Sequence, residues 1–407
     1  MVTHSVQVWA FVTLFSALAV GQQTGFVSTR GREIVGPSGA PLLLRGINLG
    51  NWLVPEGYMF KFDTATSPRM INGVISELVG AEKARSFWKK FRDNYVTRED
   101  ITYIKNLGLN SIRVPFNWRL FTSDEHPEVW TDEGFVMLDR VITWCHEAGI
   151  WVILDMHCAP GGQTGDNIDD SWGYPFLFDS PEDQQRTIEL WKKIAGRYKD
   201  DATVIGYDLF NEPIAHFVDT LRLNPLLEPL YKRIVSAIRQ ADTNHIVFLG
   251  GAQWDTNFRV FGPPFDRKSV YTFHRYWCDT TQSMIVEYVE FSSKYDVPVW
   301  LGESGENTNE WIAAFRRLLE RNNIGWCFWP YKKMDAPRGV VTFNRPEGWD
   351  IIVRYADSPR STYETIRSSR PPADIAWNAL EGFLNLCQFK NCRPNEHYIE
   401  ALLGKSK

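Results

Sequence analysis

The chain has 407 residues, of which 44% are hydrophobic and 23% are charged, and its formal net charge is −5. This composition supports a large packed core and excludes general disorder. The acidic balance argues against nucleic acid or an anionic membrane as a partner. Aromatic residues make up 14%, including 17 Trp, which suits either a large core or stacking against the apolar face of a sugar. We expect a monomer.

An uncharged apolar run covers residues 6–20 and ends in the small-x-small pattern Ala17-Leu18-Ala19. This pattern is typical of a secretory signal peptide, although the segment before it has His4 and no Lys or Arg. The alternative is an uncleaved N-terminal anchor, but the run is short for a membrane-spanning helix. We therefore expect a signal peptide over residues 1–21 and a secreted, extracellular or periplasmic domain over residues 22–407, with no membrane association after cleavage.

Short apolar runs alternate with longer helical patterns along the rest of the chain, which is typical of strand–helix units in a parallel sheet. The runs are apolar at nearly every position, as expected for strands covered on both faces. The predicted strands are 42–48, 110–115, 151–157, 204–211, 246–251, 270–274, 299–303 and 325–329. Eight strands predict a closed (β/α)8 barrel, the TIM barrel, as a single domain with long loops. An open doubly wound sheet competes, but no GxGxxG motif follows the first run.

The helical patterns carry end signals. Thr97 and Asp100 have the spacing of a capping box, and Ser180 stands before a proline at the first helical position. The predicted helices are 97–107, 131–148, 180–198, 226–240, 283–295 and 308–321. Residues 25–41 predict a small hairpin that closes the barrel floor. The long segment 52–90 follows the first strand, on the face where the strands end.

Six cysteines are present, and none belongs to a CxxC pair, so a structural zinc site is not expected. Four of them lie in or beside predicted barrel elements, as buried thiols do. Cys387 and Cys392 are close in sequence, and an exported protein could join them in a disulfide.

Polar residues stand at the ends of the predicted strands, and in a (β/α)8 barrel these ends converge on one pocket. They are Asn48, Arg113, His157, Asn211 with Glu212, His274 with Tyr276, Glu303 and Trp329. A single such residue is more often structural, but seven endings in register are hard to explain by packing. The sequence therefore predicts a polar pocket at this face of the barrel.

Glu212 and Glu303 follow the fourth and seventh apolar runs, so they would face each other across the barrel mouth. Two facing carboxyl groups are what glycoside hydrolysis needs, one to protonate the leaving oxygen and one to attack or stabilise the anomeric carbon. The alternative is that each carboxylate pairs with a cation such as Arg113 for structural reasons.

Several segments together carry a resemblance to a known family. They are RGINLGNWLVPEG (45–57), NSIRVPFNW (110–118), LDMHCAPGGQTG (154–165), LFNEP (209–213), FHRYW (273–277), WLGESGEN (300–307) and FWPYKK (328–333). This pattern resembles glycoside hydrolase family 5, a family of (β/α)8-barrel retaining enzymes, over nearly the whole mature chain. The opening segment and HCAPGGQTG are most similar to the exo-β-1,3-glucanase and β-glucosidase-like branch, which implies a β-glucan or β-glucoside substrate and no cofactor.

The resemblance also implies roles for the strand-end residues. Glu212 would be the acid/base and Glu303 the nucleophile, with carboxyl groups about 5–5.5 Å apart. The other implied contacts are Asn211 on the sugar 2-hydroxyl, Arg113 and Tyr276 on Glu303, His157 and His274 beside the central sugar, Trp329 beneath it, and Glu56 on the outer hydroxyls of a terminal sugar. For Glu56 the alternative is a solvated loop residue. Asn51 and Ser304 depart from the branch, which has Gly and an aromatic residue there.

Metal chemistry is a separate possibility that the sequence does not favour. Asp166, Asp169 and Asp170 could bind a hard cation, but their spacing is not that of an EF-hand, and a mobile loop that contacts sugar is the preferred interpretation. Asp155 and His157 lack an accompanying HExxH motif, and we expect their side chains to point in opposite directions. We expect no metal.

Three functional interpretations remain open from the sequence. The first is an exo-acting β-glucanase or β-glucosidase, the second an endo-β-1,4-glucanase, and the third a non-catalytic sugar-binding barrel. The long segments 52–90 and 161–178 favour a closed pocket and therefore an exo enzyme. Trp172, Trp254 and Trp277 are the candidate sugar platforms.

Overall fold

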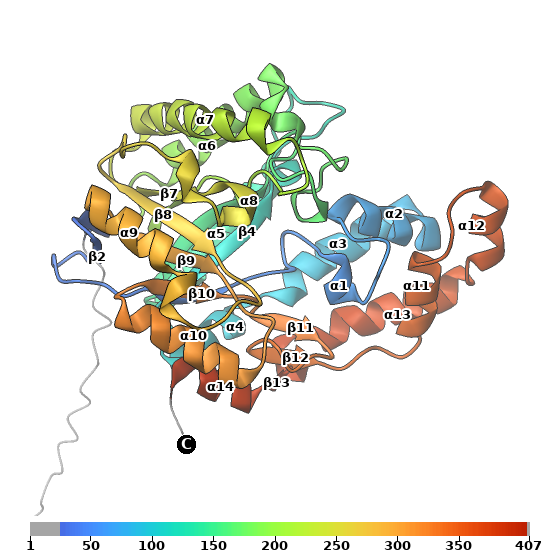
Figure 1. Cartoon of the computed structure of the whole chain (residues 1–407). Helices are drawn as coiled ribbons and strands as arrows, with labels where there is room; N and C mark the ends of the chain where they lie inside the picture. Colours follow the sequence, from blue (N-terminus) through green and yellow to red (C-terminus); the bar gives the residue numbers. More distant parts are fainter. Residues whose placement is uncertain (1–24, 405–407) are drawn as a thin grey trace, which may run out of the picture.

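The computed structural model describes residues 25–404, so the predicted signal peptide over residues 1–21 lies outside the described residues. Eight parallel strands close into a barrel in the order β10-β3-β4-β5-β6-β7-β8-β9 (Figure 1). They are β3 (Arg45–Asn48), β4 (Ser111–Asn117), β5 (Trp151–Cys158), β6 (Val204–Asp208), β7 (Ile246–Gly250), β8 (Ser269–His274), β9 (Val299–Glu303) and β10 (Gly325–Phe328). Each overlaps one predicted strand, so the predicted barrel is confirmed.

The barrel interior explains why the strands are apolar almost throughout. One buried cluster joins inward side chains of several strands, among them Ile153, Phe248 and Trp300. The hairpin of β1 (Ser28–Arg30) and β2 (Glu33–Val35) adds Val27 and Ile34 to the same cluster. The predicted hairpin is therefore present and packs against the barrel core.

Helices between the strands cover the outside of the barrel. They are α4 (Arg98–Leu107), α5 (Glu133–Ala148), α6 (Pro181–Tyr198), α7 (Thr220–Ala241), α9 (Val286–Tyr295) and α10 (Asn309–Arg321). The Thr97–Asp100 capping box is present, and the Ser180 hydroxyl accepts the backbone N–H of Asp183. The start predicted for α7 is wrong, because this helix begins six residues earlier and runs through Pro225 and Pro229.

The helices of the long first loop and those of the C-terminal segment have no counterpart among the predicted helices. They are α1 (Gly57–Phe60), α2 (Pro68–Val79), α3 (Ala81–Tyr95), α11 (Trp349–Ala356), α12 (Tyr363–Ser369), α13 (Ala373–Leu386) and α14 (Glu396–Leu403). Helix α13 packs against α2 and α3, so the two segments form one helical group beside the barrel (Figure 1). A small sheet of β11 (Lys332–Met334), β12 (Val341–Phe343) and β13 (Arg393–Pro394) adjoins this group.

All six cysteines are free thiols, including Cys387 and Cys392, whose disulfide the sequence left open. The Sγ of Cys392 instead lies 3.6 Å from the backbone oxygen of Cys387. Within residues 25–404, no helix has the length and apolar character that crossing a membrane requires.

Candidate active site

The Arg113 guanidinium is the centre of the polar network at the barrel mouth. It is completely buried on β4, four residues before the end of that strand rather than at its end. Its Nε lies 2.8 Å from Asp208, and its Nη1 lies 3.1 Å from Asp155 and 2.5 Å from Glu303. Its Nη2 donates to the Asn211 side-chain oxygen at 3.0 Å. One cation therefore links side chains from or just after three other barrel strands, β5, β6 and β9, and fixes their directions.

The Glu303 carboxylate, at the end of β9, is held from two sides. Arg113 contacts Oε1, and the Tyr276 hydroxyl donates to Oε2 at 3.1 Å. Nitrogen atoms of His157 and His274 each lie 3.9 Å from the carboxylate. The contacts predicted for Arg113 and Tyr276 are thus present.

Glu212 follows β6, which ends at Asp208 and not at Asn211 as predicted. Its backbone has a positive φ of 50°, a sparsely populated conformation for a non-glycine residue. Burial raises the pKa of its carboxyl to about 7 against the lowering effect of His157 and Arg113. One oxygen of this carboxyl lies within 4.8 Å of a Glu303 oxygen. The two carboxyl groups therefore face each other at the close spacing expected for a retaining pair.

Two side chains, His274 and Asp255, support the Glu212 carboxyl in sequence. Its Oε1 lies 2.8 Å from His274 Nδ1, and the other ring nitrogen lies 3.3 Å from Asp255 Oδ2. The backbone N–H of Glu212 also donates to Asp255, at 3.3 Å. Burial lowers the pKa of His274 to about 3, so the ring is neutral and its single N–H proton can sit on either nitrogen. Asp255 was not predicted as a site residue.

The Asp255 carboxyl occupies space that is open only because residue 250 is a glycine. A Cβ at Gly250 would lie 2.1 Å from its Oδ1, although the backbone of Gly250 itself needs no positive φ. Asp255 is fully buried, and burial together with Asp208 and Glu212 raises the pKa of its carboxyl well above the usual range. The paired glycines before Gln253-Trp254-Asp255 were the sequence signal that could have pointed to this residue.

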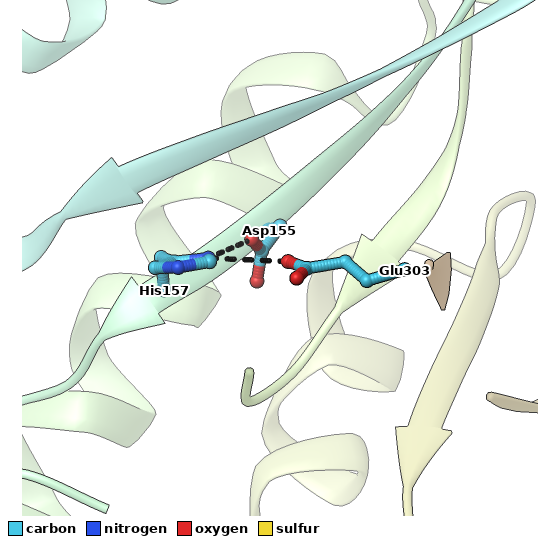
Figure 2. Close-up of side chains that lie close together, drawn as sticks. All are labelled: Asp155, His157 and Glu303. Atoms are coloured by element: carbon cyan, nitrogen blue, oxygen red, sulfur yellow. Dashed lines mark hydrogen bonds and ion pairs between the residues drawn. The ribbon is translucent and has the colours of Figure 1, made fainter. Parts of the chain in front are cut away.

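His157 and Asp155 lie side by side on β5 and point toward Glu303 (Figure 2). The ring Nδ1 lies 2.8 Å from Asp155, so the prediction that the two side chains diverge is wrong. Residues two positions apart on a strand share a face. Burial lowers the pKa of His157 to about 4. The neutral ring donates from Nδ1 to Asp155 and accepts at Nε2 from the Asn211 amide, 3.3 Å away.

Two sets of side chains have the spacing of a metal site: Asp155, His157 and Glu303, and Glu212, His274 and Glu303. The first set already surrounds the Arg113 guanidinium, which contacts both of its carboxylates. A metal cation would have to sit beside this buried positive charge, which is unfavourable. The carboxylate Glu303 is common to both sets, so the same objection applies to the second.

A pocket of about 580 Å³ opens above these residues. It is lined by Glu56, Tyr58, His157, Asp166, Ile168, Glu212, Trp254, Thr256, His274, Arg275, Tyr276, Trp277, Glu303, Glu306, Trp329 and Arg338. Seven of the nine predicted site residues line it. The other two, Arg113 and Asn211, are buried beneath the pocket. Each contacts a residue that lines it, Arg113 contacting Glu303 and Asn211 contacting His157. The predicted side chains therefore lie together at one face of the barrel.

Glu56 is buried and lines the pocket, so it is not the solvated loop residue of the alternative interpretation. Its Oε1 has no hydrogen-bond partner, and burial next to Glu303 and Glu212 raises the pKa of its carboxyl well above the usual range. Asn51 fixes the loop, because its side-chain oxygen accepts the backbone N–H of Glu56 and its φ of 64° suits asparagine. The buried carboxyl is therefore available to a hydroxyl-rich ligand.

Tyr58 joins three loops into a wall at one side of the pocket. Its hydroxyl accepts from the Trp329 indole at 2.8 Å and donates to Glu306 at 3.2 Å. The Lys333 ammonium lies 2.7 Å from Glu306 and 4.3 Å from the centre of the Tyr58 ring. We call these four residues the Tyr58 wall. None of Tyr58, Glu306 and Lys333 was predicted as a site residue, because they lie beyond the ends of the barrel strands, where the local sequence does not specify which segments meet.

Trp329 forms part of the pocket floor next to His157, with nearly parallel rings 5.6 Å apart. A Cβ at Gly50 would lie 2.6 Å from its ring, so glycine is needed for this position. Of the candidate sugar platforms, Trp254 and Trp277 line the pocket. Trp172 does not; it is 78% exposed and stacks with Arg69 instead.

The loop with three aspartates is held by internal contacts. Asp169 accepts the backbone N–H groups of Thr164 and Gly165, and Asp170 contacts Arg69. Both carboxylates are therefore already in use, while Asp166 lines the pocket. A hard cation would have to compete with these contacts for Asp169 and Asp170.

Comparisons with known proteins agree with this architecture. A family model described as Cellulase (glycosyl hydrolase family 5) matches residues 74–335. A β-xylosidase of Phanerodontia chrysosporium is 35% identical over 369 residues, which cover 81% of this chain and 75% of the relative. Endoglucanase C of Acetivibrio thermocellus is 25% identical over 311 residues, or 61% of this chain and 88% of that relative.

Two further similarities are more distant or shorter. The sporulation-specific glucan 1,3-β-glucosidase of Saccharomyces cerevisiae is 34% identical over 223 residues, which cover 51% of this chain and 49% of the relative. A solved endogalactoceramidase structure has a TM-score of 0.61 at 16% identity and covers 93% of this chain and 84% of its own; this similarity shows the fold. The chain belongs to glycosyl hydrolase family 5, the cellulase family of retaining glycoside hydrolases.

Proposed function

We propose that the protein is an exo-acting retaining β-glycosidase that removes a terminal glucosyl unit from a β-glucan or β-glucoside. The observation that carries this proposal is the Tyr58 wall. An exo enzyme needs a pocket closed beyond the terminal sugar, whereas an endo enzyme needs an open cleft. Hydrogen bonds of the Tyr58 hydroxyl close one side of the pocket with contributions from three loops. The unpartnered Glu56 carboxyl lines the same pocket.

The proposed reaction has two steps. Glu303 attacks the anomeric carbon and forms a glycosyl ester, while the Glu212 carboxyl gives its proton to the leaving oxygen. Glu212, now ionised, takes a proton from water, and the resulting attack at the anomeric carbon breaks the ester and restores both carboxyl groups. The pKa of Glu212, raised to about 7, suits a group that must act as acid and then as base.

The remaining predicted residues receive binding roles in this proposal. Arg113 and Tyr276 hold the Glu303 carboxyl group in position, and Asn211 offers its second amide hydrogen to the sugar 2-hydroxyl. His157 and His274 flank the bound sugar, with Trp329 beneath it. Glu56 accepts outer hydroxyls, which would satisfy its unpaired oxygen.

Product analysis tests the exo assignment. Laminarin, cellotetraose and gentiobiose should release only glucose at early times, and an aryl β-glucoside should also be cleaved. The rates on an aryl β-glucoside and an aryl β-xyloside should be compared to identify the preferred terminal sugar, because one relative is a β-xylosidase. Xylose differs from glucose in lacking the C6 hydroxymethyl group. Early di- or trisaccharides would instead support the endo-β-1,4-glucanase alternative, for which endoglucanase C is the relevant relative. Absence of any released reducing sugar would support a non-catalytic barrel.

Asp255→Asn should lower kcat/KM at neutral pH by about tenfold, or ~1.4 kcal/mol, the scale of one hydrogen bond to a charged group. His274 Nε2 lies 3.3 Å from Asp255 Oδ2 and has no hydrogen-bond partner among the described residues of the parent. The new amide can donate to this nitrogen, which fixes the ring proton on Nδ1, where it donates to Glu212. This favours ionised Glu212 and lowers its pKa, so the basic limb of the pH profile should move to lower pH. Asp200→Asn, at an exposed residue, is the control. An unchanged pH profile with unchanged thermal stability would show that Asp255 has no such role.

A further inference from the structure

A second cleft lies beside the catalytic pocket, outside the barrel mouth. Its volume is about 670 Å³, larger than that of the catalytic pocket. Pro55 lines this cleft, whereas the next residue, Glu56, lines the catalytic pocket. Likewise Asp170 lines the cleft, whereas Asp166 lines the pocket. Two short chain segments therefore separate the two depressions. Helices α2, α3 and α5 supply most of the remaining cleft wall.

The cleft carries an excess of positive charge. Its basic residues are Arg69, Arg85, Lys89, Arg92, Arg119 and Arg140, and its acidic residues are Asp93, Glu133 and Asp170. Each of these carboxylates already contacts at least one of the basic side chains. The other acidic partner is Asp124, which pairs with Arg119 from outside the lining. The surplus charge attracts an anion to the cleft.

Unused hydrogen-bond donors point to the same kind of ligand. The Nη1 of Arg69 and the Nε of Arg140 are buried and have no acceptor. A buried donor without an acceptor is unfavourable, and guanidinium groups match carboxylates well. Arg85 is exposed on α3, and no hydrogen bond or ion pair of its side chain occurs within residues 25–404. It is therefore free to meet a ligand.

Aromatic rings add a surface suited to sugars. Trp88 lines the cleft and is held by Asn72, which accepts from its indole at 2.9 Å. At the border, Trp172 is 78% exposed and stacks with Arg69, whose guanidinium carbon lies 3.7 Å from the ring centre. The backbone oxygens of Asp170 and Ser171 accept from Arg69 and hold it there. An exposed ring on a fixed arginine offers an apolar face next to a positive charge.

We propose that this cleft, bordered by Trp172, binds a saccharide that carries a carboxylate, such as a uronic acid unit of a glycan. The carboxylate meets the surplus arginines, and the pyranose face lies on the aromatic surface. The site is separate from the catalytic pocket and does not depend on the reaction that the pocket catalyses. It would hold an acidic glycan next to the catalytic pocket, across the two chain segments that separate the two depressions.

Calorimetry with glucuronate, glucose and acetate at equal ionic strength tests the site. Glucuronate should bind more tightly than glucose, which lacks the charge, and than acetate, which lacks the ring. Its affinity should fall as salt rises from about 50 to about 500 mM, because screening weakens exposed charge contacts. Arg85→Glu should weaken glucuronate binding by about tenfold or more, and Trp172→Ala should weaken it as well. Equal affinity for glucuronate and glucose, or for glucuronate and acetate, would overturn the proposal.

The control is Arg317→Glu, which makes the same charge change at an exposed position on α10, away from the cleft. It should bind glucuronate as the parent does. Hydrolysis of a neutral aryl β-glycoside should be the same for the parent and all three variants, so loss of the acidic-sugar site and failure of the proposed reaction give different results. Glucuronate affinity unaffected by Arg85→Glu would place any binding in the catalytic pocket and contradict the proposal.

Discussion

Glu303→Gln should reduce kcat by roughly 10⁴-fold or more on every substrate the parent cleaves, which is the scale of losing a group that reacts in the transition state. The amide has nearly the same shape as the carboxylate but is a very poor nucleophile. It can still accept from Tyr276, so substrate binding should survive while chemistry stops. Steady-state kinetics with an aryl β-glucoside, together with a binding measurement, separates these effects.

The fold should tolerate this change. Arg113 keeps Asp155 and Asp208 as carboxylate partners when Glu303 becomes neutral, so its buried charge is not left uncompensated. Glu310→Gln is the matched control, because it removes an exposed carboxylate from the first turn of the following helix. The control should keep full activity. If the Glu303→Gln enzyme kept nearly the parental kcat, Glu303 would not be the nucleophile.

The barrel was predictable because burial on both faces leaves a strong sequence signal. Runs such as residues 151–157 are mostly apolar, as expected for strands that are covered on both faces, and helical patterns lie between them. The residues at the strand ends were predictable for the same reason, since the fold brings all parallel strand ends to one face. Once the strands were placed, Glu212 and Glu303 had to meet.

The loops were less predictable, because their contacts come from parts of the chain that are distant in sequence. The sequence around Tyr58 does not indicate that Glu306 and Trp329 lie beside it in the fold. Asp255 follows two residues in the left-handed region and is itself in that region, a run that local preferences do not anticipate. The shared direction of the Asp155 and His157 side chains, in contrast, was predictable, because residues two positions apart on a strand lie on the same face.

The first long helix of the loop after β3 has a regular start signal in its sequence. Ser67 accepts the backbone N–H of Met70, and Pro68 occupies the first position of α2. Ser followed by Pro is a regular helix start. The early start of α7 was harder to anticipate, because prolines inside a helix remove backbone donors and normally argue against one. Asp219 caps this helix by accepting the N–H of Arg222.

Glu212→Ala should separate the two steps of the proposed reaction. With a dinitrophenyl β-glucoside, whose leaving group needs little protonation, Glu303 should still form the glycosyl ester. Without Glu212 as base, water should release the sugar slowly, and turnover should fall by roughly 10²- to 10⁴-fold. Azide needs no base and is small enough for the vacated space, so it should restore turnover. The product should be the β-glycosyl azide, identified by its anomeric NMR coupling.

Two further measurements make this result specific to Glu212. The parent requires protonated Glu212 for the first step, so its kcat/KM should fall as pH rises through about 7, the pKa to which burial raises this carboxyl. That limb should vanish in Glu212→Ala, because the titrating group is gone. Glu306→Ala removes another carboxylate from the same pocket and should show no azide rescue. An α-azide from Glu212→Ala would mean that azide attacks the substrate directly and that no glycosyl ester forms, whereas rescue of Glu306→Ala would show that azide acts on the pocket in general.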